Sequence, residues 1–430
     1  MNPEFRRQLW LQFSPTRLAL LPSLLLTVFV AVFLTATEHP APALAIAAAL
    51  LFVFLVGAMG TFAAGASVID EITDRTWDQQ RMSAMQPWAM TWGKLAGATA
   101  YGWYGGALCL LVALPAAMLG AQRQWLPQLT LAAILSGVFL HALLIAVNLQ
   151  LAKVGGRMAR RGGIWALVLV LLWGLGPLFA VVRRDGVSWW NLPFNNLDFA
   201  LASAALFAVC AVGAAWRSMA EMLAVRQWPW GWPALALVAT VYLSGFAPGH
   251  RLAVLGVVGL GTCAVLTYFA LLAEPQSRPS WQRVTTRLAL GQWRAACLQL
   301  PRWPTTLLLA LPFALLTALT LNQHVTLPWA ISDQMQLQPL AVVLLMARDC
   351  ALALFFAFSP KGRRPVLAFA VLMLVLYGLL PWLLGAAGSK LLLQLAQPMW
   401  VPGGLSLLIA AVHLAVVLGL LRWRWRATAP

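Results

Sequence analysis

The chain has 430 residues, of which 61% are hydrophobic and 10% are charged, and its mean hydropathy is +0.80. No soluble core of this length needs so much apolar surface, so the composition excludes a soluble globular protein. The formal net charge of +17 suggests nucleic-acid binding, but the basic residues form short clusters between apolar runs, as in polytopic membrane proteins that bind no nucleic acid.

Twelve apolar segments are long enough to cross a bilayer as helices. Their apolar residues are continuous rather than alternating, which predicts an all-α polytopic integral membrane protein. The predicted spans are residues 18–36, 42–69, 93–120, 128–152, 163–182, 198–216, 232–247, 252–273, 304–322, 337–358, 365–387 and 401–421.

The basic residues predict the orientation of these spans. With the N-terminus inside, the cytoplasmic segments hold 23 of the 29 Lys and Arg, the outer segments hold five, and Arg348 falls within a span. Because Lys and Arg concentrate on the cytoplasmic side of membrane proteins, both termini are predicted to be cytoplasmic.

Residues 3–16 and 280–303 mix Arg with Trp and Leu and run directly into a span, which is typical of interfacial helices. Their similar surroundings indicate either an internal duplication or simply two helices of the same kind. The predicted organisation is an interfacial helix at 1–17, a first transmembrane unit at 18–216, a linker with two spans at 217–279, a second interfacial helix at 280–303 and a second transmembrane unit at 304–430.

The segment from Asp70 to Lys94 is charged and lies between the second and third predicted spans, on the cytoplasmic side. It holds four of the twelve acidic residues of the chain. Opposite charges three or four positions apart predict a short helix over residues 71–86, ended by Pro87. The spaced pairs are Glu71 with Arg75 and Asp78 with Arg81.

Apolar side chains stand among these charges, namely Trp77, Met82, Met85 and Trp88. Exposed apolar residues beside charges suit a docking surface, and the alternative is an ordinary solvated loop. Thr91 is predicted to cap the next helix, which begins at Gly93 and Lys94.

The two flanking spans carry small residues at close intervals, which let helices approach each other. The second span holds Gly57, Thr61 and Gly65, and the third holds Gly93, Gly97, Gly102 and Gly106. Loop and spans are therefore expected to move as a unit.

The pattern of Glu71, Arg75-Thr76, Met82, Pro87 and Gly93-Lys94 resembles the cytoplasmic loop of permease subunits of type-2 ABC exporters. In that family the loop contains a coupling helix that inserts into a notch on the ATPase subunit, and an interfacial connecting helix precedes the first span. The resemblance is clearest over residues 1–120 and extends to about 216.

The resemblance implies a transport permease of a bacterial cytoplasmic membrane, which works with an ABC ATPase dimer and leaves open a second permease chain. ATP and Mg would bind to the ATPase, and this chain would bind no cofactor or metal of its own. The implied docking residues are Glu71, Arg75, Thr76, Trp77, Asp78, Arg81, Met82, Pro87 and Lys94.

The chain departs from the family pattern at several points. Arg75 stands where the family usually has glycine, and about twelve spans replace the usual six. The basic loop at 361–364 is too short to repeat the loop of the first half. A phosphate loop is also missing, because Gly93-Lys94 is followed by Leu95 and lacks the upstream glycine.

Arg348 and Asp349 fall inside the tenth predicted span, where charges are costly. They indicate either a substrate or conformational site, or a pair that satisfies itself. His141, Asn148, Gln150 and His413 are expected to be hydrogen-bond partners between helices. Residues 183–198, outside the membrane, correspond to short re-entrant helices in the resembled family, and a plain loop is the alternative.

Three functions compete at this point. An ATP-driven permease, which is an exporter by resemblance, is the leading hypothesis. An ion- or proton-coupled transporter with twelve spans is the alternative, although Asp349 is the one clearly intramembrane acid. A membrane enzyme is disfavoured because the outer acids Glu38, Asp185, Asp198 and Asp333 are widely separated.

Overall fold

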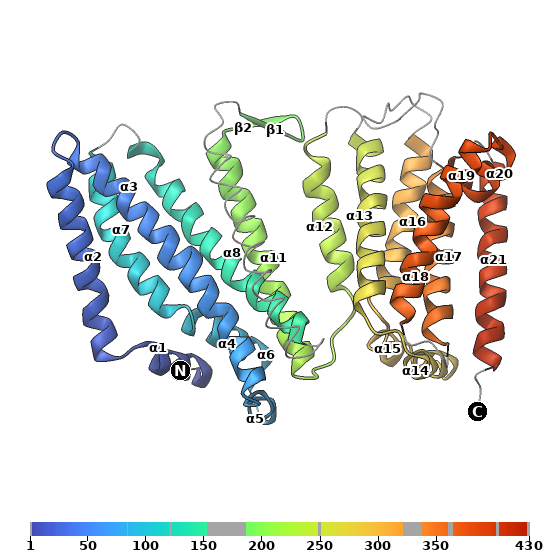
Figure 1. Ribbon diagram of the computed structural model, residues 1–430, viewed down its shortest axis with the longest axis horizontal. Coiled ribbons are helices and arrows are strands. Elements are labelled where there is room, and N and C mark those ends of the chain that lie inside the picture. Colours follow the sequence, from blue (N-terminus) through green and yellow to red (C-terminus); the bar gives the residue numbers. More distant parts are fainter. Residues whose placement is uncertain are drawn as a thin grey trace. The chain divides into compact units, whose positions relative to one another are not determined.

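The computed structural model describes residues 2–83, 85–119, 123–152, 186–247, 251–320, 338–359, 364–400 and 404–427. These residues are mainly helical, and ten helical segments among them are long and apolar enough to cross a membrane (Figure 1). The chain is therefore an all-α multi-pass membrane protein in its architecture.

Ten of the predicted spans correspond to these ten segments. The predicted span at 232–247 corresponds to α12 (Gly231–Ser244), which is apolar but shorter than the others. The predicted span at 163–182 lies outside the described residues.

The chain divides into two compact units. Unit 1 comprises Met1–Val187 and Pro193–Gln227, and unit 2 comprises Ser188–Leu192 and Trp228–Pro430. In the predicted organisation, residues 217–279 are a linker with two spans, residues 280–303 are an interfacial helix and residues 304–430 are the second transmembrane unit. Helices α12 and α13 (Arg251–Ala273) belong to unit 2 because α13 packs extensively against α16 (Trp303–Thr320).

The described residues of unit 1 form nine α-helices and the π-helical segment η1. The α-helices pack in pairs, α3 on α7, α8 on α11 and the short α1 on α6. Their bounds are α1 (Pro3–Gln12), α2 (Pro15–Thr35), α3 (Pro40–Phe52), η1 (Val53–Gly60), α4 (Thr61–Thr73), α5 (Trp77–Met82), α6 (Pro87–Gly97), α7 (Ala100–Met118), α8 (Leu126–Ala152) and α11 (Asn196–Met222), with the 3-10 turn η2 (Arg123–Trp125) before α8.

The start of α1 follows from local chemistry. The Asn2 side chain caps the helix by accepting a hydrogen bond of 3.0 Å from the backbone N–H of Glu4, and Pro3 occupies the first turn, where its missing N–H costs nothing. Glu4 adds a negative charge near the positive end of the helix dipole. Helix α1 then runs crosswise to α2, as expected for an interfacial helix (Figure 1).

Unit 2 contains the remaining helices and a second π-helical segment, η4. Besides α12, α13 and α16, its elements are α14 (Arg278–Ala289), α15 (Trp293–Cys297), α17 (Pro339–Ala357), α18 (Pro365–Leu374), η4 (Val375–Leu379), α19 (Leu380–Ala386), α20 (Lys390–Ala396), the 3-10 turn η5 (Pro398–Trp400) and α21 (Gly404–Ala427). Helix α17 packs against α16, α18 and α21.

A β-hairpin, β1 (Val187–Trp189) and β2 (Leu192–Phe194), occupies part of the segment where the family resemblance implied re-entrant helices. Trp190 and Asn191 form its two-residue turn with φ values of 54° and 59°. Positive φ at both turn positions matches the twist of the flanking strands. The expectation of short helices is thus wrong for residues 187–194, and residues 183–185 lie outside the described part.

Candidate functional site

The segment between Asp70 and Lys94 is not the single short helix that its charge spacing predicts. Helix α4 continues to Thr73, the six-residue α5 follows, and α6 begins at Pro87. Pro87 therefore starts a helix rather than ending one, because its fixed φ suits the first helical position. Thr91 lies inside α6, where its hydroxyl donates to the Pro87 carbonyl at 2.8 Å, so it is not a cap.

Arg75 makes the turn between α4 and α5. Its φ is +58°, in the left-handed region. The backbone N–H of Thr76 donates to the Glu71 carbonyl at 3.0 Å and that of Arg75 donates to the Ile72 carbonyl at 3.3 Å. These two bonds make a Schellman motif, which favours glycine at the position that Arg75 holds. The departure from the family pattern at Arg75 thus concerns the side chain and leaves the turn intact.

Changing Arg75 to glycine is expected to raise the free energy of unfolding by about 1 kcal/mol, because it removes the left-handed strain of a residue with a Cβ. The matched control is Arg81→Gly, inside α5, which is expected to lower stability by about the same amount. Thermal unfolding of the purified variants in one detergent measures both. Equal effects of the two changes would contradict the assignment of strain to Arg75.

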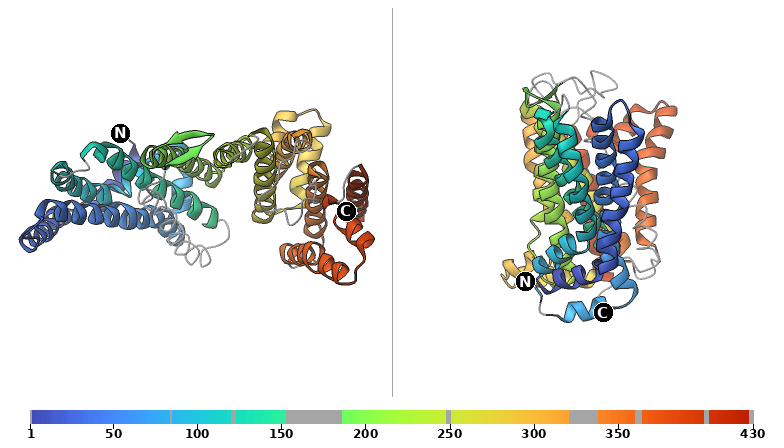
Figure 2. Two further views of the ribbon diagram at one scale, coloured as in Figure 1. Left: turned by 90° about the horizontal axis from the view of Figure 1, so that it is seen from above. Right: turned by 90° about the vertical axis from the view of Figure 1, so that its left-hand side faces the viewer.

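Helix α5 lies beyond the ends of the other helices of unit 1, at the end where α1 lies (Figures 1 and 2). Its Trp77 side chain is buried in a core cluster formed by α4, α6, α8 and α11. Asp78, Arg81 and Met82 are exposed, and Met82 is 80% exposed. One side chain therefore anchors α5, and three of the predicted docking residues remain free for contact.

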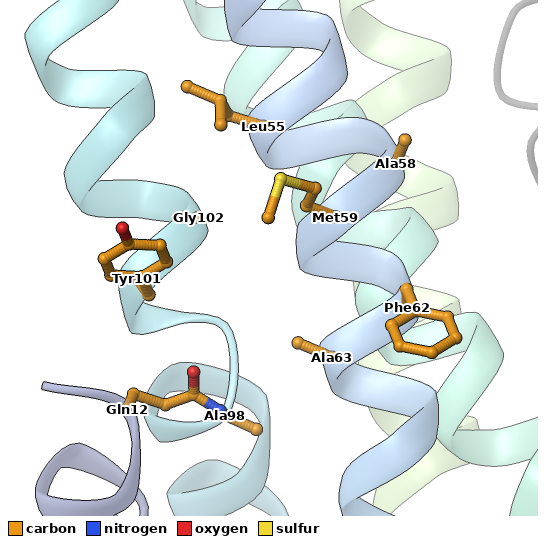
Figure 3. A pocket seen from close by; sticks show the side chains of 9 residues that line it. All are labelled: Gln12, Leu55, Ala58, Met59, Phe62, Ala63, Ala98, Tyr101 and Gly102. Carbon is orange, nitrogen blue, oxygen red and sulfur yellow. The ribbon is translucent and has the colours of Figure 1, made fainter. Parts of the chain in front are cut away.

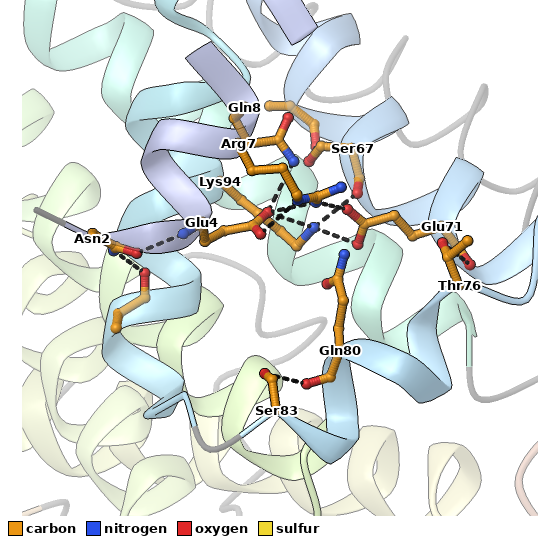
Figure 4. Close-up of polar contacts among 12 residues, drawn as sticks. Asn2, Glu4, Arg7, Gln8, Ser67, Glu71, Thr76, Gln80, Ser83 and Lys94 are labelled. Carbon is orange, nitrogen blue, oxygen red and sulfur yellow. Dashed lines mark hydrogen bonds and ion pairs between the residues drawn. The ribbon is translucent and has the colours of Figure 1, made fainter. Parts of the chain in front are cut away.

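The buried Lys94 lies directly behind this anchor. Its ammonium group is fully buried and sits 5.9 Å from the centre of the Trp77 ring. It donates to the Ser67 carbonyl at 3.1 Å, pairs with Glu4 at 3.3 Å and contacts the Glu71 carboxylate (Figure 4). Three oxygens thus surround the three N–H donors of the ammonium, which a buried lysine requires.

Two further ion pairs extend this cluster to the N-terminal helix. Arg7 donates to both carboxylate oxygens of Glu4, at 2.8 and 2.9 Å, and also contacts Glu71. Gln8 donates to Glu4 at 2.9 Å. Glu71 therefore pairs with Arg7 and Lys94 rather than with Arg75 as its spacing predicted. We call Glu4, Arg7, Glu71 and Lys94 the ion cluster.

The environment of Glu4 changes its titration. Burial alone would raise the pKa of Glu4, but the hydrogen bond from Arg7, the charge of Lys94 and the hydrogen bond from Gln8 outweigh it and lower the pKa to about 2. The contacts with Glu4 and Glu71 in turn raise the pKa of Arg7 despite its burial. Glu4 and Arg7 are thus both ionised at neutral pH.

A lowered pKa of Glu4 predicts a pH dependence for the docking of α1. The stabilisation is fully present above the unfolded value of about 4.5 and is lost as the pH falls from there towards about 2. Protease cleavage within residues 1–14, measured between pH 7 and pH 3 with an acid-tolerant protease, is expected to rise only below about pH 4.5. A Glu4→Gln variant is expected to show a weaker pH dependence, and an identical profile would contradict the role of Glu4.

Glycines let α1 approach α6 closely enough to form the ion cluster. A Cβ at Gly93 would lie 2.7 Å from the Glu4 Cβ, and a Cβ at Gly97 would lie 2.6 Å from the Gln8 Cβ. Such distances are well below van der Waals contact. Gly93 and Gly97 therefore let α6 approach the N-terminal helix, whereas the two spans that flank the loop approach each other at Gly102, where a Cβ would lie 2.8 Å from the Leu55 carbonyl oxygen.

Gly93→Ala is expected to lower the free energy of unfolding by about 1–3 kcal/mol, because the methyl group overpacks the contact with α1. Gly213→Ala is the control, since nothing lies within 4 Å of a Cβ at this helical position and alanine is favoured there. Thermal unfolding should therefore show opposite shifts for the two variants, and a stabilised Gly93→Ala protein would contradict the close contact.

A groove of about 380 Å³ opens beside the break between α6 and α7 (Figure 3). Its lining is mainly apolar and comes from the end of α1, from η1 and α4, and from the α6–α7 break. The lining residues are Gln12, Leu55, Ala58, Met59, Phe62, Ala63, Ala98, Tyr101 and Gly102. Next to it, the π-helical turn leaves the Val56 carbonyl free to accept a hydrogen bond of 2.8 Å from His141 Nε2.

The second predicted polar site lies in unit 2. Arg348 and Asp349 are buried on α17, and Arg348 donates to Asp349 Oδ1 at 2.7 and 2.9 Å. Tyr268 and Tyr377 donate to Asp349 Oδ2 at 2.7 and 2.6 Å, and Arg348 lies 3.3 Å from His413 Nδ1. The two charges thus pair with each other and with side chains from α13, η4 and α21.

Several of these residues were missed by sequence reasoning. Glu4 and Arg7 supply two of the four residues of the ion cluster. Their spacing of three residues in a short amphipathic helix was the one feature of the sequence that indicated an ion pair. Tyr268 and Tyr377 gave no signal, because a tyrosine in an apolar span has no local partner. Gln150 does contact another helix, donating to Ser218 at 2.9 Å, as predicted.

Within the described residues, no three His, Cys, Asp or Glu side chains come together in an arrangement that could hold a metal ion.

Comparison of the chain with models of protein families, with curated proteins and with solved structures finds no match.

Proposed function

We propose that this chain is the transmembrane subunit of a transporter and that its helix α5 docks on a separate ATPase, as in the permeases of type-2 ABC exporters. The observation that carries the proposal is the anchoring of α5. Its exposed face offers Asp78, Arg81 and Met82, while its buried Trp77 contacts the same core as α4, α6 and α8. The burial of Trp77 holds α5 against the core, which suits a docking helix better than an ordinary solvated loop.

The anchoring supports transmission of movement from α5 to three other helices. The Schellman motif at Arg75 ties α5 to α4, Trp77 packs beside Lys94 of α6, and the ion cluster ties both to Glu4 and Arg7 of α1. A buried, fully paired charge cluster resists separation because each unpaired charge is costly. A displacement of α5 is thus passed on rather than absorbed locally.

We expect a displacement of α5 to change the groove near the break between α6 and α7. The groove is lined by the end of α1, by η1 and α4, and by the break at Ala98 between α6 and α7. Of the helices around the groove, α1, α4 and α6 carry the residues of the ion cluster. We infer that movement of α5 changes the width of this groove, and that the groove belongs to the path of an apolar or amphipathic substrate.

The test must act on the exposed face of α5. A Glu71→Ala change does not do so, because Glu71 is buried in the ion cluster and its loss disturbs the fold. Met82→Asp changes only the exposed face, and Val225→Asp, at an exposed position after α11, is the matched control.

The chain and a candidate ATPase are co-expressed, and copurification and ATP hydrolysis are measured in proteoliposomes. Met82→Asp is expected to abolish both association and the stimulation of hydrolysis, whereas Val225→Asp leaves them unchanged. Undiminished association and hydrolysis with Met82→Asp would refute docking through α5.

A second candidate function is favoured by the Arg348–Asp349 pair. An intramembrane carboxylate that accepts from two tyrosines and an arginine suits proton- or ion-coupled transport. Proteoliposomes loaded with a pH-sensitive dye test this candidate. Proton flux that needs no ATP and is lost in Asp349→Asn would favour coupled transport, and its absence in the wild type would exclude proton coupling.

A further inference from the structure

The connection between α13 and α16 in unit 2 contains a basic, amphipathic pair of short helices. Both α13 and α16 are long and apolar enough to cross a membrane. The connection, residues 274–302 with α14 and α15, joins the end of one span to the start of the next, and Figure 1 shows it at that end of unit 2. It therefore lies at the boundary between membrane and water.

One side of this connection is fixed to the unit. Val284 of α14 and Ala296 of α15 are buried. The Trp281 and Trp303 rings pack 5.7 Å apart, and the Arg278 guanidinium lies 5.3 Å from the Trp425 ring at the end of α21. Helices α14 and α15 thus have a set orientation, and the same side chains are always turned outward.

The outward side of the connection carries three arginines. Arg283 and Arg287 lie one helical turn apart on α14, and Arg294 lies on α15, beyond the turn at Gly291. Arg283 and Arg294 are exposed, and Arg287 is partly exposed. We call Arg283, Arg287 and Arg294 the basic face.

Acidic groups do not balance this charge. The sequence between residues 274 and 302 contains five arginines and one acidic residue, Glu274. Glu274 is paired with Arg302 at 3.1 Å, away from the basic face. Arg283 donates to the Pro279 carbonyl at 3.3 Å, Arg287 donates to Gln292 Oε1 at 3.2 Å, and Arg294 lies 5.9 Å from the centre of the Trp228 ring. These partners are uncharged, so the positive charge of the basic face can attract an anion.

Apolar side chains stand beside these arginines at the turn between α14 and α15. Gly291 makes the turn with a φ of +70°, and Leu290 and Trp293 on either side of it are 65% and 67% exposed. Exposed Leu and Trp next to Arg are unfavourable in water, but they match the headgroup region of a bilayer, where apolar groups enter and cations stay at the phosphates.

We infer that the basic face binds anionic phospholipid headgroups and gives unit 2 a preference for anionic over zwitterionic lipid. The position between two spans supplies contact with the lipid surface, and the unbalanced arginines supply the selectivity. An acidic protein surface would also meet the charge, but it would leave Leu290 and Trp293 without the apolar environment that the bilayer provides. This inference does not depend on the proposed function.

Photoactivatable lipids test the inference on the full-length chain. The protein is reconstituted into nanodiscs of phosphatidylcholine in which about one fifth of the lipid is phosphatidylglycerol, and one of the two lipids carries the photoactivatable group at its headgroup end. Peptides within 274–302 are then quantified by mass spectrometry. Three substitutions, Arg283→Gln, Arg287→Gln and Arg294→Gln, are combined in one variant, and Arg6→Gln, Arg75→Gln and Arg81→Gln in unit 1 are its charge-matched control.

Phosphatidylglycerol is expected to label the segment at least about fivefold more than phosphatidylcholine at equal concentration, which corresponds to the effect of a single arginine at a membrane surface. The triple change in the basic face should bring the ratio close to one, and the control should preserve it. Equal labelling by both lipids in the wild type, or an unchanged ratio in the basic-face variant, would overturn the inference. So would labelling by neither lipid together with protection of the segment only when a protein partner is present.

Discussion

Replacing Lys94 with methionine is expected to lower the free energy of unfolding by about 3–5 kcal/mol, because it leaves the buried carboxylates of Glu4 and Glu71 without their central cation. Methionine keeps the length and apolar stem of the side chain, so packing changes little. The loss should be largest where the cluster holds α1, and protease cleavage near residues 3–12 is expected to increase. Thermal unfolding and limited proteolysis in detergent measure the two effects.

The matched control for this change is Lys390→Met, since Lys390 is an exposed lysine of unit 2. It is expected to change stability by less than about 0.5 kcal/mol. A Lys94→Met protein that unfolds and is cleaved like this control would show that the ion cluster contributes nothing to the docking of α1. This result would also contradict the proposed transmission of movement from α5 to α1.

Removing one charge of the Arg348–Asp349 pair is expected to be as costly as the loss of Lys94. Arg348→Met leaves Asp349 fully buried with two tyrosine donors and no cation, which costs about 3–5 kcal/mol. Adding Asp349→Asn removes the unpaired charge but keeps an oxygen that accepts from Tyr268 and Tyr377. The double variant is therefore expected to be more stable than Arg348→Met alone.

Denaturant unfolding of the two single variants and the double variant forms a double-mutant cycle that isolates the coupling of the pair. Arg364→Met, at an exposed arginine of unit 2, is the control for the loss of a positive charge. Equal stability of Arg348→Met and the control, or a double variant less stable than both single variants, would contradict the pairing of Arg348 with Asp349.

The transmembrane architecture could be predicted because it depends on local properties. A span needs about twenty apolar residues and satisfies its own backbone, so length and composition suffice to find it. The predicted spans at 18–36 and 252–273, for example, agree closely with Pro15–Thr35 and Arg251–Ala273. Predicted positions were less accurate at 93–120, where α6 and α7 are separate helices.

The polar contacts could not be predicted in the same way. The spacing of Glu71 and Arg75 favours a local pair, but the left-handed turn at Arg75 ends the helix between them, and Glu71 finds Arg7, 64 positions earlier. The pairing of Glu71 with Arg7 depends on where α1 packs against α4 and α6. The local sequence around Glu71 does not indicate that position. Similarly, Lys94 was expected at a docking surface and is instead buried behind it.

The exposed part of the proposed docking surface is smaller than the predicted set of docking residues. Of the nine residues implied by the family resemblance, Asp78, Arg81 and Met82 form the exposed part of α5, and Arg75 and Thr76 are exposed in the turn before it. Glu71, Trp77 and Lys94 are buried and hold α5 in place. Pro87 starts α6. This division separates residues whose substitution should affect contact from those whose substitution should affect the fold.

Site-specific cross-linking tests whether α5 contacts an ATPase. A photoreactive amino acid is introduced at Met82, on the exposed face, and at Lys390 as an exposed control, and the full-length chain is irradiated in its native membranes. Mass spectrometry then identifies the cross-linked protein. We expect position 82, but not position 390, to cross-link to a protein with a phosphate loop and an ABC signature. Cross-links from position 82 to lipid alone, or to proteins without a nucleotide-binding motif, would contradict a contact between α5 and an ATPase.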